Sequence, residues 1–200
     1  MAETAEDVER DEDEAAPQPP PLDPEVAARR AAALAHVRKF GDPVLKSRAL
    51  PVERFDDALR EEIGRMSLIM RDGLGIGLAA TQLGVMHRVL VYRIGEDASL
   101  APLVNPRIEW SGKETEIVEE GCLSLPGVHV DVERPLYVRV LAQDEWGDEV
   151  QVEATGLEAR VIQHEIDHLD GVLMLDRTTR EQRKLAMREL REAAEAARAA

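Results

Sequence analysis

Apolar residues recur at a helical spacing in the segment 55–70. Phe55, Leu59, Ile63, Met66 and Met70 follow one another at intervals of three or four residues. Because an α-helix completes a turn in ~3.6 residues, this spacing places the five side chains on one face. The segment 55–70 is therefore predicted to be an amphipathic helix.

Three further helices are predicted, over residues 27–37, 157–169 and 179–198. The first follows Pro24 and Glu25, and both residue types favour a helix start. The second ends just before Gly171, a residue type that often terminates helices.

The middle of the chain changes its period. Short segments rich in β-branched residues predict strands over 88–94, 108–110, 115–118, 136–141 and 150–154. Turn signals separate them at Asn105-Pro106, Ser111-Gly112 and Trp146-Gly147. Helices and strands are segregated along the chain instead of alternating, so the pattern predicts an α+β fold with mainly antiparallel sheet.

The segment 1–24 has a different composition from the rest. It carries nine acidic residues, one basic residue and five prolines, with few apolar residues. Such a segment buries too little apolar surface to offset the entropy lost on ordering. We therefore expect an acidic, proline-rich disordered tail over 1–24 and one folded domain over 25–200, which includes the helix at 179–200.

The charge balance excludes some classes of function. The chain has 25 basic and 40 acidic residues, a net charge of −15, which disfavours direct DNA binding. No apolar segment is long enough to span a membrane, and no signal-peptide pattern starts the chain. A single cysteine cannot form an internal disulfide. These features predict a soluble cytoplasmic protein.

The segment His164-Glu165-Ile166-Asp167-His168 lies within a predicted helix. Residues four apart share one helix face, so His164 and His168 can bind one metal ion, with Glu165 placed to act on a bound water. A surface helix that carries two histidines by chance would show the same pattern. The motif therefore indicates a metal site without establishing one.

A metal site of this kind needs a third protein ligand. Metalloproteases commonly supply it downstream of the helix, where this chain offers Asp170, Asp176, Glu181 and Glu189 in no recognisable pattern. Upstream, Cys122 lies within Glu120-Gly121-Cys122-Leu123-Ser124. A lone cysteine is usually a small buried apolar residue, so its role as a ligand depends on the neighbouring motifs.

A third segment, Gly75-Ile76-Gly77-Leu78-Ala79-Ala80-Thr81-Gln82, contains two closely spaced glycines. Glycines let the backbone approach a ligand closely. The segment does not match the dinucleotide-binding fingerprint, because the third glycine is absent. We expect a loop that exposes backbone amides, with the Gln82 side chain as a further donor.

Taken together, these three segments resemble the signature motifs of bacterial peptide deformylases, G-x-G-x-A-A-x-Q, E-G-C-L-S and H-E-x-x-H. They occur in the family's order, and the resemblance covers residues 35–178. It implies antiparallel β-sheets packed around a central metal-binding helix, with a C-terminal helix. It also implies an enzyme that removes the N-formyl group from the N-terminal methionine of nascent polypeptides and releases formate.

The resemblance assigns roles to individual residues. The implied metal ligands are Cys122, His164 and His168. The family's usual ion is Fe²⁺, while Zn²⁺, Ni²⁺ or Co²⁺ can occupy the site. A metal-bound water would be the nucleophile and Glu165 the general base and acid. Gln82 and the backbone N–H of Leu123 would stabilise the oxyanion.

The resemblance also places the substrate. The peptide is expected to bind as an added strand beside Ile76, Gly77 and Gly121, with its methionine in a pocket near Val118, Leu157 and Arg160. The Arg160 stem would pack against methionine while its charge reaches solvent. Glu120 braces the site in the family, and here His129 occupies the position of its usual arginine partner. Arg134 and Asp167 match a pair that ties a strand to the metal helix.

Other readings remain open at this stage. A different metallohydrolase, such as a small endopeptidase, would need a downstream third ligand. A ribosome-associated protein with an inactive site would need a broken ligand set. The segment 179–200 carries six basic and four acidic residues, which suits either a contact with the ribosome or a solvated amphipathic helix.

Overall fold

The computed structural model describes residues 21–95 and 98–199. The predicted disordered tail over 1–24 falls mostly on residues 1–20, which lie outside the described residues. The helices and 3-10 helices are α1 (Pro24–Leu34), η1 (Pro43–Lys46), α2 (Asp57–Asp72), η2 (Ala80–Leu83), α3 (Gly156–Leu169), η3 (Met174–Asp176) and α4 (Arg180–Ala199). All four helices expected from the sequence are present, with ends shifted by a few residues.

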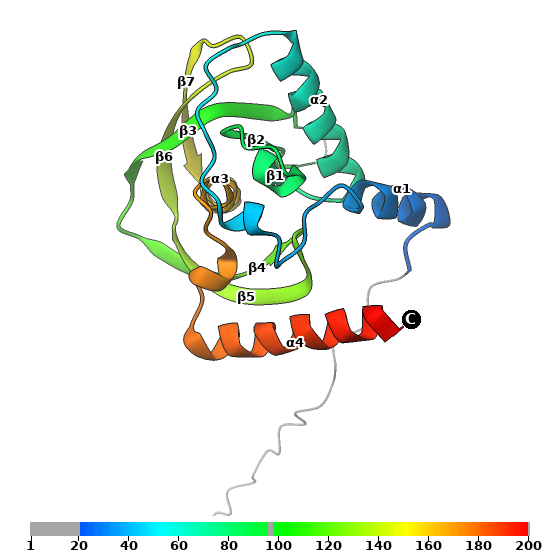
Figure 1. Cartoon of the computed structure of the whole chain (residues 1–200). Coiled ribbons are helices and arrows are strands. Elements are labelled where there is room, and N and C mark those ends of the chain that lie inside the picture. The colour runs from blue at the N-terminus through cyan, green and yellow to red at the C-terminus, as the bar shows by residue number, and fades with distance from the viewer. Residues whose placement is uncertain (1–20, 96–97, 200) are drawn as a thin grey trace, which may run out of the picture.

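The strands form two antiparallel sheets. They are β1 (Gly77–Ala79), β2 (Val89–Tyr92), β3 (Ala101–Ser111), β4 (Thr115–Cys122), β5 (Leu125–Pro135), β6 (Tyr137–Gln143) and β7 (Glu149–Thr155). A five-stranded sheet has the order β1-β2-β3-β6-β7, and β4 pairs with β5 in a second sheet. The α+β class with antiparallel sheets and a C-terminal helix is thus confirmed (Figure 1).

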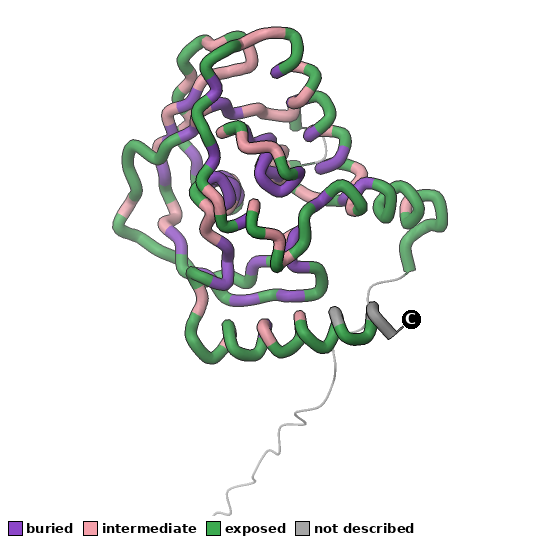
Figure 2. Tube along the Cα trace, viewed as in Figure 1, coloured by how far each residue is buried: buried purple, intermediate pink, exposed green. Residues whose placement is uncertain are grey.

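The helix α3 runs through the centre of the fold, between the two sheets (Figure 1). Ala159 and Ile162 on this helix are fully buried among residues of the five-stranded sheet. In contrast, α1 and α4 lie on the outside and expose most of their surface (Figure 2). A helix buried on nearly all sides provides a rigid, dry support for polar side chains.

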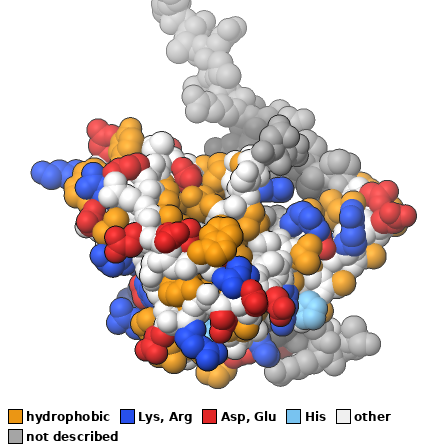
Figure 3. All heavy atoms as spheres, turned by 90° about the horizontal axis from the view of Figure 1, so that it is seen from above, with side chains coloured by type: hydrophobic (Ala, Val, Ile, Leu, Met, Phe, Trp, Pro, Cys, Tyr) orange, Lys and Arg blue, Asp and Glu red, His pale blue; other side chains and the backbone are white. Residues whose placement is uncertain are grey.

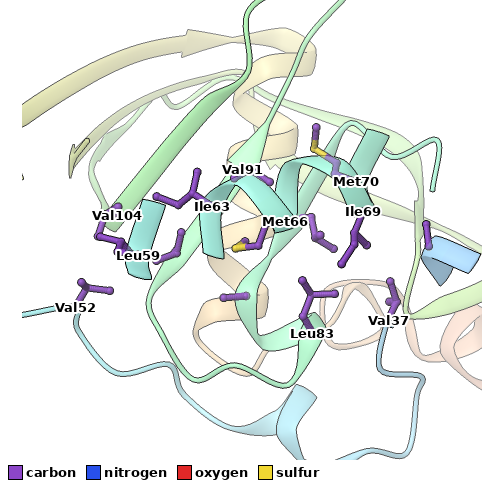
Figure 4. Packing of buried hydrophobic residues seen from close by; sticks show 14 residues of the cluster. Val37, Val52, Leu59, Ile63, Met66, Ile69, Met70, Leu83, Val91 and Val104 are labelled. Carbon is purple, nitrogen blue, oxygen red and sulfur yellow. The ribbon is translucent and has the colours of Figure 1, made fainter. Parts of the chain in front are cut away.

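The amphipathic helix α2 covers one side of the five-stranded sheet. Asp56 caps it by accepting a hydrogen bond from the Leu59 N–H at 3.2 Å. Its apolar stripe packs toward Val91 and Val104 of the sheet (Figure 4). Burying a side chain such as Leu or Ile contributes about 1.5–3 kcal/mol each, so this stripe accounts for the position of the helix.

The prediction of a turn at Asn105-Pro106 was wrong. Both residues lie inside β3, where the register with β6 shifts between Val104 and Arg107. Asn105 adopts a positive φ of 53°, and its side chain bonds to both the N–H and the C=O of Val52. The residues that favour a turn therefore form a β-bulge that ties the sheet to a distant loop.

Two strands were not predicted. In β5, Val128, Val130 and Val132 are buried and alternate with exposed residues, which is a pattern typical of a strand. The expected loop over 75–82 is also only partly a loop, because Gly77–Ala79 forms β1 and Ala80–Leu83 a 3-10 helix. Both strands border the cavity that Cys122 and His164 line.

On the face seen in Figure 3, acidic and basic side chains are mixed, with hydrophobic side chains between them. Within the described residues, no helix is long and apolar enough to cross a membrane.

Candidate metal centre

Two histidines of α3 face the same side of the helix. His164 and His168 lie one turn apart, and their ring centroids are 5.0 Å from each other. The helix begins at Gly156, whose φ of 56° turns the chain sharply from β7 into α3. His168 is almost completely buried, whereas His164 is partly accessible.

Cys122 approaches the two histidines from the end of β4. Its Sγ lies 3.2 Å from His168 Nε2, and one ligand atom from each of Cys122, His164 and His168 lies within 4.8 Å of the others. In the described part of the chain, this is the only such group of potential metal ligands. Two imidazoles and a thiolate suit a divalent transition metal with one position left open.

The three groups change one another's pKa values. Although burial opposes ionisation, the neighbouring His168 and His164 hold the pKa of the Cys122 thiol well below its usual value. Burial likewise opposes the charge on His164, but Cys122 and Glu120 raise its pKa well above the usual value. The thiolate, which is the form that binds metals, is therefore the favoured state of Cys122.

Glu165 lies beside the three ligands and is almost completely buried. Its Oε2 atom has no hydrogen-bond partner among the described residues, and burial raises the pKa of its carboxyl. The backbone of β1 lies close against it at Gly77, where only the absence of a Cβ leaves room for the Glu165 carboxylate. A buried carboxylate with a free oxygen is suited to accept and return a proton.

Gln82 is held in a defined orientation on the other side of Cys122. Its Oε1 accepts a hydrogen bond from the Ala79 N–H at 2.9 Å, which turns its Nε2 toward Cys122 Sγ at 3.6 Å and Ser124 Oγ at 3.2 Å. Leu123 follows Cys122 directly, and its carbonyl accepts a hydrogen bond from Lys39 Nζ at 3.1 Å. The amide N–H groups of Gln82 are thus directed to the region of the three ligands.

Glu120 is the centre of a buried ionic network. It accepts hydrogen bonds from Arg134 at 2.6 and 2.9 Å and from Arg160 at 2.7 Å, and its Oε2 lies 2.9 Å from His164 Nδ1. Burial alone would raise the pKa of Glu120, but His164 and Arg134 hold it well below its usual value. Arg134 continues the network to Asp167 at 2.9 Å.

His129 does not replace the family's arginine as a partner of Glu120, and the expectation for the Arg160 charge was wrong. Glu120 bonds to Arg134, Arg160 and His164, not to His129, whose ring packs instead over Gly121. The Arg160 guanidinium does not reach solvent. It is buried and also donates to the carbonyls of Val132 and Glu116, because β4 and β5 cover that face of α3.

Cys122, His164 and Glu165 line a cavity of about 530 Å³. Of the residues expected to bind substrate, Ile76, Gly77, Glu120, Gly121, Leu157 and Arg160 line it. Val118 does not line the cavity, although its side chain is exposed on β4.

The cavity also has walls that the sequence analysis missed. They include Leu74 before β1, residues 126–129 near the start of β5, and Arg30 and Leu34 of α1. Arg30 and Leu34 share one face of a predicted helix, but this spacing alone does not indicate that the face borders a cavity.

A thiolate and two imidazoles at the bottom of a cavity, beside a buried glutamate on the same helix, define the class of metal-dependent hydrolases that use a His-Glu-x-x-His helix. A sequence model of the polypeptide deformylase family matches residues 34–184. The chain belongs to this family and is an enzyme of the peptide deformylase class.

Individual relatives agree with this assignment. The peptide deformylase of Thermotoga neapolitana is 46% identical over 162 residues, which are 81% of this chain and 98% of the relative. That of Acidothermus cellulolyticus is 48% identical over 157 residues, 78% of this chain and 86% of the relative.

Solved structures give the same result. A peptide deformylase from Synechococcus elongatus in complex with actinonin has a TM-score of 0.74 at 43% identity, covering 76% of this chain and 85% of that one. The structure of the peptide deformylase from Thermotoga maritima has a TM-score of 0.69 at 45% identity, and the match covers 72% of this chain and 96% of that one.

Proposed function

We propose that this protein removes the formyl group from the N-terminal methionine of newly synthesised polypeptides in the cytoplasm and releases formate. The observation that carries the proposal is the convergence of Cys122, His164 and His168 within 4.8 Å at the base of a cavity, next to the unpartnered Oε2 of Glu165. Membership in the deformylase family indicates which bond such a site hydrolyses.

Cys122, His164 and His168 would hold one divalent ion, with Fe²⁺ proposed as the native metal. Such an ion would lower the pKa of a water from ~15.7 toward ~7 and polarise the formyl oxygen. The donor set fits this role, since the pKa of the thiol is lowered and Glu120 fixes the ring of His164 through Nδ1.

Glu165 would take up the proton of the attacking water at its free Oε2 and deliver it to the departing methionine nitrogen. The Gln82 amide and the Leu123 backbone N–H would donate to the oxygen that becomes negative as the formyl carbon turns tetrahedral. Each donor of this kind contributes about 2.7–4 kcal/mol to lowering the barrier.

The substrate peptide is proposed to bind beside β1 and β4. Among the described strands, β1 pairs only with β2 and β4 only with β5, so each has a free edge. Ile76, Gly77 and Gly121 border the cavity on these edges, and a peptide backbone can pair with them as an added strand. Leu157 and the stem of Arg160 would then contact the methionine side chain.

Formate release from formyl-Met-Ala-Ser, measured anaerobically with the bound metal quantified, tests the proposal. The loaded protein should release formate, removal of the metal should abolish release, and Glu165→Ala should keep the metal but lose nearly all turnover. Absence of formate from a fully loaded protein would contradict the proposal, and cleavage of an internal peptide bond would indicate an endopeptidase instead. Full activity of loaded Glu165→Ala would refute the role of Glu165.

A contact with the ribosome through α4 is a separate proposal. The helix anchors one face on β5, where Gln182 Nε2 donates to Asp131 at 2.7 Å and Ala186 is buried. Basic residues such as Arg180, Lys184 and Arg191 are exposed on it. A salt-sensitive pull-down with ribosomes should succeed with the full chain and fail without residues 179–200; absence of binding by the full chain would remove the idea.

A further inference from the structure

The helix α1 lies almost entirely outside the residues that match the deformylase family, which begin at residue 34. It is nevertheless a well-anchored element. Asp23 caps it by accepting a hydrogen bond from the Glu25 N–H at 2.9 Å, and Ala33 is buried in the cluster that α2 forms with the sheet. Figure 1 shows α1 lying at the end of α2. Its position is therefore set by packing.

One face of α1 forms an outer wall of the cavity that holds the metal ligands. Arg30 and Leu34, four residues apart on this face, both line the cavity. Leu34 also lies against the end of α2. A Cβ built on Gly73, which follows the last residue of α2, would be 3.6 Å from the Cδ2 atom of Leu34. Leu123 also lines the cavity, and a Cβ on Gly75 would be 3.0 Å from its Cδ1 atom. A peptide that extends from the metal ligands along Ile76 and Gly75 thus passes between α1 and the segment after Cys122.

This wall carries positive charge. The Arg30 side chain is exposed, and it has no hydrogen bond or ion pair to any other described residue. Lys39 lies nearby. Burial lowers the pKa of the Lys39 ammonium group, and the positive charge of Arg30 lowers it further. Lys39 Nζ is bound to the Leu123 carbonyl at 3.1 Å, so this second positive charge is fixed beside the cavity.

The negative charges that face the same cavity do not cancel this wall. The Cys122 thiolate lies against His164 and His168. Glu120 is already paired with Arg134 and Arg160, and Glu165 is buried next to the metal ligands. Glu119 is the one exposed carboxylate among the residues that line the cavity, and it belongs to β4. An acidic side chain of a bound peptide would therefore meet an unpaired guanidinium at α1.

We propose that α1 extends the substrate groove beyond the methionine pocket and that Arg30 makes the enzyme prefer peptides with acidic side chains in the residues after formyl-methionine. The inference rests on the proposed function, because it concerns the remainder of the same substrate. An exposed guanidinium contributes modestly to binding, so the preference is about two- to fivefold in kcat/KM. It decreases as salt screens the charges.

The test uses the metal-loaded full-length protein and amidated formyl-Met-Ala pentapeptides whose third and fourth residues are both Asp, both Ala or both Lys. Amidation removes the C-terminal carboxylate, so only side-chain charge varies. Wild type should show the highest kcat/KM for the Asp peptide, mainly through KM, and this advantage should shrink between about 0.05 M and about 0.5 M NaCl. Arg30→Ala should remove the advantage, and Arg30→Glu should invert it.

Arg29→Ala is the matched control, because Arg29 is exposed on the same helix but does not line the cavity. It should keep the wild-type preference. Equal kcat/KM for the three peptides in wild type, or an unchanged preference in Arg30→Glu with an unchanged thermal unfolding midpoint, would overturn the inference. Formate release from the Ala peptide separates this result from failure of the proposed function, in which no peptide would be deformylated.

Discussion

Arg160 Nη1 lies 2.7 Å from Glu120 Oε1, while the other oxygen of the same carboxylate lies 2.9 Å from His164 Nδ1. A residue expected at the wall of the methionine pocket thus also supports a metal ligand through one intermediate side chain. Its guanidinium compensates the buried charge of Glu120, which in turn fixes the orientation of the His164 ring. Partners of this kind commonly change metal affinity by 10–100-fold, so ~10-fold is a reasonable expectation for one of two arginines.

Arg160→Leu should therefore weaken metal retention about tenfold, because Glu120 loses one of its two arginine partners. Metal content after challenge with increasing chelator measures this. Arg139→Ala is the control, since Arg139 forms an exposed pair with Glu153 on the surface of the sheet. Wild-type metal retention by a folded Arg160→Leu variant would show that Arg134 alone suffices.

Gln82→Met should lower kcat by about 10²–10³-fold with a much smaller change in KM. Methionine has a similar length and fills the same space, but it lacks the amide N–H donors directed toward Cys122. Steady-state formate release at equal metal content is the measurement. Gln151→Met, an exposed change on β7, serves as the control. A change confined to KM would assign Gln82 to substrate binding instead of oxyanion stabilisation.

Gly77→Ala should abolish most activity while the metal stays bound. The added methyl would overlap the Glu165 carboxylate, and Glu165 is too deeply buried to move aside freely. Displacing a general base typically costs 10²–10⁴-fold in rate, so about 10²-fold is expected here.

Gly64→Ala provides the comparison for that variant. Gly64 lies on the exposed side of α2, and a Cβ there meets no atom within 4 Å. Alanine should raise the free energy of unfolding by about 0.5–1 kcal/mol without affecting turnover. If Gly77→Ala kept wild-type turnover, the close packing of β1 against Glu165 would have no role in catalysis.

Tyr92 and Glu158 should make stability depend on pH in alkaline solution. The Tyr92 hydroxyl donates to Glu158 at 3.0 Å, and burial followed by the Glu158 charge raises the pKa of Tyr92 above its usual value of ~10. A raised pKa in the folded state means that this contribution is fully present below pH ~10 and is lost as the pH rises toward the folded-state pKa.

Urea unfolding of wild type and Tyr92→Phe from pH ~8 to pH ~11 would test this dependence. The variant should be less stable by about 1 kcal/mol at the lower pH, and the difference should shrink above pH ~10. A difference that stays constant over this range would contradict the assignment. The titration of Tyr92 itself can be followed by phenolate absorbance in Tyr137→Phe, because this variant removes the only other tyrosine of the sequence.

Local patterns in the sequence were sufficient for the helices and for the grouping of Cys122, His164 and His168. The spacing of His164 and His168 defines a shared face, and the three motifs identify Cys122 as their partner. The surroundings of Arg160 could not be predicted in this way, because helix spacing gives the side that it faces and not what covers that side. Its partners come from β4 and β5, which lie about 30–40 residues away in sequence.

Similarly, Arg30 precedes every recognisable motif, and only packing against α2 brings it to the cavity. The Asn105-Pro106 signal predicted a turn because a bulge within a long strand uses the same residue types.

The free edges of β1 and β4 have a consequence for selectivity. An edge offers only backbone N–H and C=O groups, which are the same for every peptide, and so it can accept chains of almost any sequence. The same property invites pairing with another copy of the protein. The shortness of β1, which has three residues, and the exposed carboxylates of Glu116 and Glu119 on β4 both disfavour that pairing. The protein can thus bind the backbone of many different peptides and still be a poor template for its own aggregation.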